Sequence, residues 1–329
     1  MSKIRVGMIR CDLHAYWYAA LFAEHDAELL GKIHPCLQWL FYGGYWDEPT
    51  SKRVPTVPGF ELARLWDHDR ATAEQMATVF CKKPVVCDNV DQVCHDVDLV
   101  FIADCFTEGE DHRQLAEVAM SNRIPLFVDK PMTHTLADAK DMINFAQKHR
   151  TPLMSASLLL QSPEAARFRR RFAEIAPVNM GIVRGAVGKA GNLAGIFHTL
   201  SLAQALFGQG VGCVEAMGNR PFEYLRLHYP NGEQDPFEVL VINNYVVARH
   251  IYCGFRADVY GQSGVIHSPF VDDFVFPNAG ACILDSLKKM VATKEPPLSY
   301  DSMLELIRIV EAGRIAQKSR RTVELSELD

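Results

Sequence analysis

The stretch Phe127-Val128-Asp129-Lys130-Pro131 closes an apolar run that begins at Ile124, so a charged pair and a proline stand at the end of that run. In an open sheet of parallel strands, ligands bind beyond the carboxyl ends of the strands, and a lysine there faces the binding crevice. Pro131 ends the strand pairing because it has no N–H group to donate. We therefore expect a functional strand end in an α/β domain.

The residues around this stretch predict alternating strands and helices. Thr135-Leu136-Ala137-Asp138 is typical of a capping box, and apolar residues then recur at helical spacing as far as His149. Upstream and downstream, the sequence predicts strands at 4–9, 61–66, 99–103 and 152–156 and helices at 15–30, 71–80 and 113–121. Such alternation implies a Rossmann-type, doubly wound parallel sheet with right-handed crossovers.

After about residue 157 the pattern changes to successive strands with short turns. These strands are predicted at 180–184, 213–217, 224–229, 237–242, 246–253 and 255–260, and helices at 279–292 and 302–316 close the chain. A chain of 329 residues is long for one compact domain. We expect an N-terminal domain at 1–157 and a C-terminal α+β domain at 158–329 with an open, mostly antiparallel sheet.

Composition narrows the class of function. A net charge of -6 gives no reason to expect nucleic acid or an anionic membrane as partner. There is no apolar run of bilayer-spanning length, and the first residues enter a strand rather than a signal-peptide core, so we expect a cytoplasmic protein. The nine cysteines are scattered without a C-x-x-C pair, which argues against a disulfide framework and a structural zinc site.

Residues 32–60 are rich in aromatic side chains and longer than an ordinary α–β connection. The aromatic residues are Trp39, Phe41, Tyr42, Tyr45 and Trp46. Two interpretations stay open: a loop that covers its own domain, and a lid or subunit contact.

Several motifs together resemble the Gfo/Idh/MocA oxidoreductases, the family related to glucose-fructose oxidoreductase and inositol dehydrogenase. They are the apolar strand 98–103, His112 at the next helix, 127–131 where the family usually has Glu-Lys-Pro, and the closing segments 296–298 and 309–312. The resemblance implies a Rossmann domain that binds NAD or NADP. It also implies a second domain that supplies substrate contacts and subunit interfaces, a sugar or polyol substrate, and a homo-oligomer, either a dimer or a tetramer.

The loop that should bind the cofactor's pyrophosphate differs from the G-x-G-x-x-G fingerprint. Here it reads Arg10-Cys11-Asp12-Leu13-His14-Ala15, so both leading glycines are replaced. Asp12 would bring a carboxylate close to two phosphate charges, a repulsion on the order of a kcal/mol or more. Arg10 could neutralise that carboxylate or bind a phosphate itself.

Asp67 lies where a carboxylate would accept the ribose hydroxyls of NAD. The alternative is that Asp67 or Asp69 caps the following helix, and Arg70 could instead favour the phosphorylated ribose of NADP. The full set of cofactor-binding residues that the resemblance implies is Arg10, Cys11, Asp12, Leu13, Asp67, His68, Ala103, Asp104, Cys105, His112 and Asp129.

The resemblance implies two catalytic residues. Lys130 would hydrogen-bond the substrate hydroxyl and stabilise developing alkoxide charge. His198 would move its proton, although the family pattern D-x-G-x-H-x-x-D reads Ala194-Gly195-Ile196-Phe197-His198-Thr199-Leu200-Ser201 here, and only the histidine is shared. A lone histidine on an apolar helix can equally be a packing residue.

We expect no metal site, because Asp12 and His14 could share an ion but spacing fixes no third ligand. The leading hypothesis is hydride transfer between NAD(P) and a sugar or polyol hydroxyl. One alternative is a member that lost cofactor binding and acts as a ligand-binding or scaffolding protein. Another is a redox-neutral sugar-modifying enzyme with tightly bound NAD.

Overall fold

The structure is a computed structural model, and it describes residues 2–43, 52–105, 107–187, 193–218, 224–230, 237–244 and 253–329. The chain divides into two compact units. The first comprises Met1–Ser155 and Gly280–Ser299, and the second comprises Ala156–Ala279 and Tyr300–Asp329.

The first unit is built on a six-stranded parallel sheet with the strand order β3-β2-β1-β4-β5-β6. Its strands are β1 (Ile4–Ile9), β2 (Phe60–Trp66), β3 (Val85–Val86), β4 (Leu99–Ile102), β5 (Leu126–Val128) and β6 (Leu153–Ser155). The order reverses between β1 and β4, which is the crevice position of a Rossmann fold. The expected α/β fold with a doubly wound parallel sheet is confirmed.

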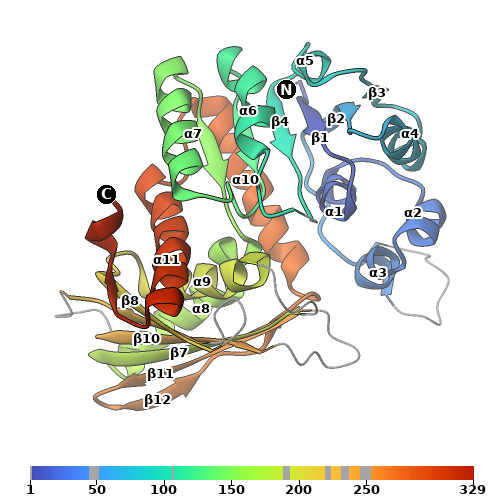
Figure 1. The fold of residues 1–329 in the computed structure, drawn as a ribbon. Helices are drawn as coiled ribbons and strands as arrows, with labels where there is room; N and C mark the ends of the chain where they lie inside the picture. The colour runs from blue at the N-terminus through green and yellow to red at the C-terminus, as the bar shows by residue number, and fades with distance from the viewer. Residues whose placement is uncertain are drawn as a thin grey trace. The chain divides into compact units, whose positions relative to one another are not determined.

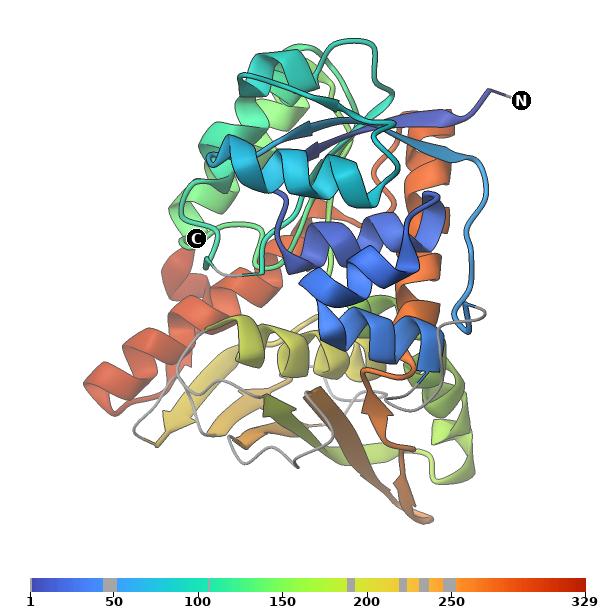
Figure 2. The same ribbon diagram turned by 90° about the vertical axis from the view of Figure 1, so that its right-hand side faces the viewer.

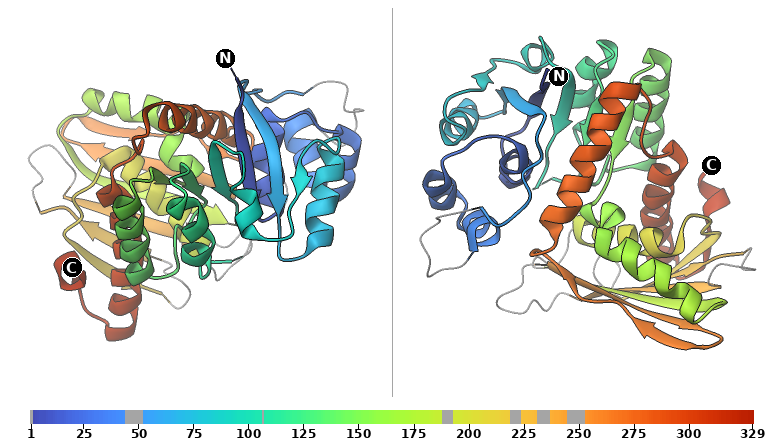
Figure 3. Two further views of the ribbon diagram at one scale, coloured as in Figure 1. Left: turned by 90° about the horizontal axis from the view of Figure 1, so that it is seen from above. Right: turned by 180° about the vertical axis from the view of Figure 1, so that it is seen from behind.

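Helices cover both faces of this sheet, with α6 and α7 on the side opposite α1 and α4 (Figures 1 and 3). The helical segments are α1 (Leu13–Phe22), α2 (Ala27–Ile33), α3 (Pro35–Gln38), the π-helical η1 (Trp39–Gly43), α4 (Arg70–Val79), α5 (Val90–Val93), α6 (His112–Ser121) and α7 (Leu136–His149). The central strands β4 and β5 are continuous apolar runs, as expected of strands with both faces buried.

The predicted helix at 15–30 is two helices. Ala23 is extended, and Asp26 starts α2 by accepting a hydrogen bond from the N–H group of Leu29. An aspartate is a strong helix-start signal, and here it overrides an apolar pattern that continues through the break.

The described part of the aromatic segment packs on its own unit. Phe41 is fully buried with its ring 5.8 Å from that of Trp17, and the Tyr42 hydroxyl lies 2.6 Å from Nε2 of His25. Tyr45 and Trp46 lie outside the described residues.

The second unit contains an eight-stranded mixed sheet ordered β12-β11-β7-β10-β9-β8-β14, with β13 paired to β11. Its strands are β7 (Val178–Val187), β8 (Cys213–Met217), β9 (Tyr224–His228), β10 (Glu238–Asn244), β11 (Cys253–Gly261), β12 (Gly264–His267), β13 (Val271–Asp272) and β14 (Val323–Glu324). Most neighbours are antiparallel, as expected. The pair β7 and β10 is parallel, because a helix and two further strands intervene between them.

Helices of the second unit lie on one side of its sheet, as the views of α9 and α11 show (Figures 1 and 2). The helical segments are η2 (Leu158–Gln161), α8 (Pro163–Arg170), η3 (Arg171–Glu174), α9 (Leu193–Phe207), α11 (Tyr300–Ser319) and η4 (Leu325–Leu328). Helix α10 (Phe276–Thr293) carries the chain from the second unit into the first. Among the described residues, no helix is long and apolar enough to cross a membrane.

Candidate active site

Three neighbouring strands of the first unit end together. Ile9 of β1 pairs with Ile102 of β4, and Ile102 pairs with Val128 of β5. The residues that follow these strands are therefore brought to one edge of the sheet, where the sequence predicted the cofactor and the catalytic lysine.

Asp12 caps helix α1 and ties it to the loop after β4. Its Oδ1 accepts hydrogen bonds from the N–H groups of His14 at 2.9 Å and Ala15 at 3.2 Å, while its Oδ2 accepts one from the N–H group of Cys105 at 2.5 Å. Burial raises the pKa of the Asp12 carboxyl, although its hydrogen bonds oppose the shift. In a Rossmann fold, the N–H groups at this helix end bind the pyrophosphate. Here a carboxylate of the chain itself accepts from them.

Arg10 stands where the first glycine of the fingerprint would be, with a backbone φ of 68°. That left-handed conformation costs a side-chain-bearing residue about 1–2 kcal/mol, and glycine adopts it freely. The guanidinium Nη2 lies 2.6 Å from Oδ2 of Asp111, and the Nε2 of His68 lies 3.6 Å from the same oxygen. Arg10 is thus paired with a carboxylate through Nη2, while its buried Nε has no hydrogen-bond partner among the described residues.

His14 and Asp129 form a close pair, with His14 Nδ1 2.5 Å from Asp129 Oδ2. Asp129 also accepts from the N–H group of Lys130 at 2.8 Å and, at 3.4 Å, from that of Asp104. Burial opposes a charge on the imidazole, but the Asp129 carboxylate and hydrogen bonds to Asp129 and Cys105 outweigh it and raise the pKa of His14 to about 10. His14 is therefore an imidazolium at neutral pH, with 26% of its side chain exposed.

Lys130 is 6% exposed, and its ammonium group makes no hydrogen bond to another described residue. A lysine whose aliphatic stem is buried at a strand end and whose ammonium group keeps its donors open to solvent can bind a ligand there. The turn that carries it packs tightly, because a Cβ at Gly109 would lie 2.9 Å from the carbonyl oxygen of Pro131.

His112 and Asp104 make a second pair, which is fully buried. The His112 Nε2 lies 3.0 Å from Asp104 Oδ2, and its Nδ1 lies 3.1 Å from the carbonyl oxygen of Met132. Burial opposes ionisation of Asp104, but His112 and Thr107 hold the pKa of its carboxyl well below the usual range. The pair links the start of α6 to the end of β4 and so helps to fix the position of the loop that follows β4.

Asp67 follows β2 as expected, but its carboxylate is hydrogen-bonded to backbone N–H groups of the protein itself. It accepts hydrogen bonds from the N–H groups of Cys11 at 2.8 Å and Asp69 at 3.0 Å. Asp69, and not Asp67, caps α4. Arg70 is bonded to the carboxylates of Glu74 and Asp88.

The structure therefore brings together the predicted residues of the first unit at one sheet edge, with Leu13 on the first turn of α1 and Ala103 fully buried after β4. Sequence reasoning missed two charged partners at this edge, namely His14 as the partner of Asp129 and Asp111 as the partner of Arg10. His14 was visible inside the altered phosphate loop, whereas nothing in the sequence linked it to a carboxylate 115 positions later.

His198 lies on α9 in the second unit. Its Nδ1 is 2.7 Å from the hydroxyl oxygen of Ser157, which in turn accepts from the N–H group of Leu159. Ser157 thus orients the ring in the absence of the expected carboxylate. The His198 ring also has an apolar neighbour, the ring of Phe255, with 5.9 Å between the two ring centroids.

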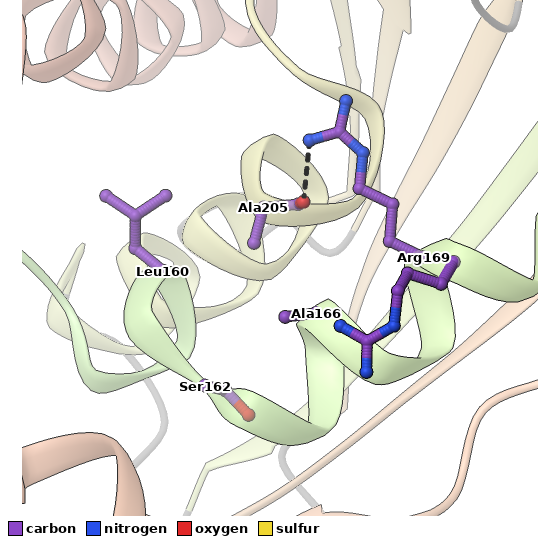
Figure 4. A pocket seen from close by; sticks show the side chains of 6 residues that line it. Leu160, Ser162, Ala166, Arg169 and Ala205 are labelled. Atoms are coloured by element: carbon purple, nitrogen blue, oxygen red, sulfur yellow. Dashed lines mark hydrogen bonds between the residues drawn. The ribbon is translucent and has the colours of Figure 1, made fainter. Parts of the chain in front are cut away.

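A separate pocket of about 390 Å³ opens in the second unit between η2, α8 and α9 (Figure 4). Two of its polar side chains have partners, since Arg169 donates to the carbonyl oxygen of Ala205 and Ser162 caps α8; Arg170 also lines the pocket. None of the predicted site residues lines it. Across the part of the chain that the structure describes, no three His, Cys, Asp or Glu side chains converge to hold a metal ion.

Residues 42–157 match the family described as an oxidoreductase family with an NAD-binding Rossmann fold, GFO_IDH_MocA. The match begins after the altered phosphate loop. No curated protein matches the sequence significantly.

Solved structures resemble the chain over nearly its whole length. A probable dehydrogenase from Thermotoga maritima is 14% identical with a TM-score of 0.73, covering 99% of this chain and 100% of its own. An oxidoreductase from Agrobacterium radiobacter in complex with NAD+, L-tartaric acid and magnesium is 16% identical with a TM-score of 0.73, covering 100% of both chains. A myo-inositol 2-dehydrogenase from Lactobacillus plantarum is 13% identical with a TM-score of 0.72, covering 98% and 99%. At such identities the likeness shows the fold.

Proposed function

We propose that this chain transfers hydride between NAD(P) and a hydroxyl group of a sugar or polyol, as an oxidoreductase of the Gfo/Idh/MocA family, whose model matches residues 42–157. The observation that carries the proposal is Lys130, a mostly buried lysine at the end of β5 whose ammonium group makes no hydrogen bond to another described residue. The names of the similar structures, among them a myo-inositol 2-dehydrogenase, support the substrate class.

The first unit fits a dinucleotide in its strand order and in the carboxylate of Asp67 at the end of β2. The N-terminus of α1 is unfavourable for a dinucleotide, because Asp12 there accepts hydrogen bonds from the N–H groups that would bind the pyrophosphate. We propose that the pyrophosphate and the Asp12 carboxylate compete for these donors. Binding then requires that Asp12 turn away or take up a proton.

The nicotinamide, when bound, supplies the hydride acceptor. Lys130 donates a hydrogen bond to the reacting hydroxyl and stabilises the negative charge that develops on its oxygen. We assign the exchange of the hydroxyl proton to His198, whose ring is oriented by Ser157.

Turnover tests this proposal. Purified protein is mixed with NAD+ or NADP+ and a panel of polyols that includes myo-inositol, and the reduced nicotinamide is followed by absorbance. The proposal expects turnover with at least one polyol, and Lys130→Met should lower it about a hundredfold or more. Turnover in Lys130→Met close to that of the unaltered protein would contradict the role of the lysine.

A second function has an observation of its own in its favour. Because Asp12 already accepts hydrogen bonds from two N–H groups at the phosphate site, a member that binds a ligand without a dinucleotide is the rival proposal. A redox-neutral reaction with tightly bound NAD is the third. Protein that co-purifies with NAD(P) excludes the rival, and product analysis without an added electron acceptor separates the third from a dehydrogenase.

We also propose a homo-oligomer that covers the open face of the second unit's sheet. Large apolar side chains of this unit are exposed, namely Met217, Tyr224, Phe237, Val265, Phe270 and Phe274. Light scattering during size exclusion should give the mass of a dimer or tetramer, and a monomer mass would refute the proposal.

A further inference from the structure

One face of the second unit's sheet keeps apolar side chains partly exposed. Side chains alternate along a strand, so the fully buried Val241 and Ala257 mark the face that the helices cover (Figure 2). Thr199 of α9 bonds to Asn243 on that covered face. The opposite face, which we call the outer face, carries four partly buried apolar side chains on the neighbouring strands β7 and β10, namely Met180, Ile182, Leu240 and Ile242. The solvated face of a sheet is normally polar, so this one is suited to a cover.

The strand register places six side chains of the outer face in one row across the sheet. Each of them is the direct partner of the next one in the pairing of the strands. In strand order from β12 to β8, the row is His267, Asp258, Ile182, Leu240, Arg226 and Glu215. The row therefore reads imidazole, carboxylate, two aliphatic side chains, guanidinium and carboxylate, with the apolar pair in its middle.

At the β12 end of the row, one carboxylate serves several cationic groups. Asp258 is 6% exposed, and its Oδ1 lies 2.6 Å from Nδ1 of His267. The same oxygen lies 3.8 Å from Nε of Arg256, while Oδ2 is paired with the guanidinium of Arg184. Arg184 and Arg256 are direct partners across β7 and β11, and the side chain of each is 46% exposed. This end of the outer face therefore has an excess of positive charge.

The β8 end has the opposite excess. The guanidinium of Arg226 lies 3.1 Å from Oε2 of Glu215, and it is also paired with Glu238. Two carboxylates thus share one guanidinium. A face with a positive end, an apolar middle and a negative end is complementary to itself when it is reversed.

A second copy of this chain is the occupant that such a face fits. Facing sheets keep their strands nearly aligned, so the axis of a twofold pair lies between the sheets and runs either along the strands or across them. We propose that two copies pair through their outer faces about an axis along the strands, between β7 and β10. This inference rests on the homo-oligomer proposed above, and it adds the orientation of the two copies.

The order of the charges along the row selects this axis. Rotation about it sets the row against its own reverse, so that Asp258 faces Arg226 of the second copy, and Ile182 faces Leu240 of the second copy. The two ends of the row, which have opposite charge, likewise face each other. An axis across the strands would instead set positive end against positive end and negative against negative, which like-charge repulsion disfavours.

Reversal of one ion pair tests the axis. Glu215→Arg combined with Arg226→Glu keeps the net charge and the pairing of these two positions, and it changes only the order of the charges along the row. Like charges then meet across the proposed axis, and the dissociation constant of the two copies should rise about a hundredfold or more. Analytical ultracentrifugation over a dilution series measures that constant, and thermal unfolding checks that the variant folds.

The matched control is Glu28→Lys combined with Lys32→Glu. It reverses an exposed ion pair on α2 of the first unit and also keeps the net charge. We expect its dissociation constant to equal that of the unaltered protein. Equal constants in both variants overturn the axis while the homo-oligomer stands. A monomer at every concentration of the unaltered protein refutes the homo-oligomer, and the axis with it.

Cross-linking tests the axis without changing a charge, and it decides the matter if the charge-reversed variant does not fold. Val265 of β12 and Cys213 of β8 lie at opposite ends of the adjacent row, so the proposed axis brings Val265 of one copy against Cys213 of the other. Within one copy, five strand spacings separate these positions, about 24 Å, which a short bismaleimide cannot span. In Val265→Cys, the reagent should link positions 213 and 265, as peptide mass spectrometry shows. Links that join two positions 265, or no link from position 265 in the oligomer, overturn the axis.

Discussion

The substitution Asp12→Asn should raise the affinity for NAD(P) and leave the helix cap in place. Asparagine is as good an N-cap as aspartate, so α1 retains its start and only the negative charge is removed. Asp12→Gly removes the charge and the cap together, and it restores the residue that the fingerprint has at this position.

The contacts of Asp12 give the size of the effect. Its Oδ1 lies 2.9 Å and 3.2 Å from the two N–H groups of α1, those of His14 and Ala15, that a pyrophosphate would need. A phosphate in that place forces the carboxylate aside, and two unit charges roughly 8 Å apart still repel by about 2 kcal/mol at an effective dielectric constant near 20. Removal of that repulsion corresponds to about a thirtyfold lower Kd.

Quenching of tryptophan fluorescence on titration with NADH and NADPH measures the Kd of each variant. Asp26→Asn is the matched control. Asp26 caps α2 through the N–H group of Leu29 at 2.9 Å, so this variant has the same change of net charge and the same kind of cap. The prediction is tighter binding in Asp12→Asn and an unchanged Kd in Asp26→Asn.

Two results would refute the reasoning. If Asp12→Asn binds no more tightly than the unaltered protein, the carboxylate does not compete with the cofactor. If Asp26→Asn gains as much as Asp12→Asn, the effect comes from overall charge and not from the N-terminus of α1.

Three further predictions concern the same sheet edge. Arg10→Gly should be about 1 kcal/mol more stable to urea than Arg10→Ala, since both lose the ion pair with Asp111 but only glycine adopts the φ of 68° freely; equal unfolding free energies would contradict the strain. Burial opposes a charge on His14, but Asp129 outweighs it and raises the pKa of His14 from 6.5 to about 10. The contribution of this pair to the free energy of unfolding is therefore fully present below pH 6.5 and is lost as the pH rises through about 10. Thermal unfolding of His14→Gln should therefore depend less on pH across that interval, and a parallel pH profile would argue against the charged pair. Lys130→Met should leave the melting temperature nearly unchanged, because the ammonium group makes no hydrogen bond to another described residue, while turnover falls about a hundredfold or more. A large loss of stability would indicate a structural role.

Much of the fold could be predicted from the sequence, because local sequence signals agree with the tertiary structure. The bounds of β1, α7 and β8 coincide with the predicted ones, since each is an apolar run or a capped helix with clear ends. The parallel pairing of β7 with β10 could not be read, because the pattern of a strand encodes which face is buried and not the direction of its neighbour.

The candidate site was readable only in part. Lys130 stands out from the sequence because a charge ends an apolar strand before a proline. The bond from His14 to Asp129 arises from tertiary contact between separate strand ends, and no local sequence pattern predicts it. Asp12 was recognised as an obstacle to phosphate, whereas its bond to Cys105 required the fold.

The central proposal is that the first unit binds NAD(P) with Asp12 in competition for its phosphates. Titration of the unaltered protein with NADH and NADPH, followed by tryptophan fluorescence, tests it most directly. The account predicts saturable binding of at least one of them, weaker than in Asp12→Asn. No saturable binding of either nucleotide, in the unaltered protein or in Asp12→Asn, would contradict it.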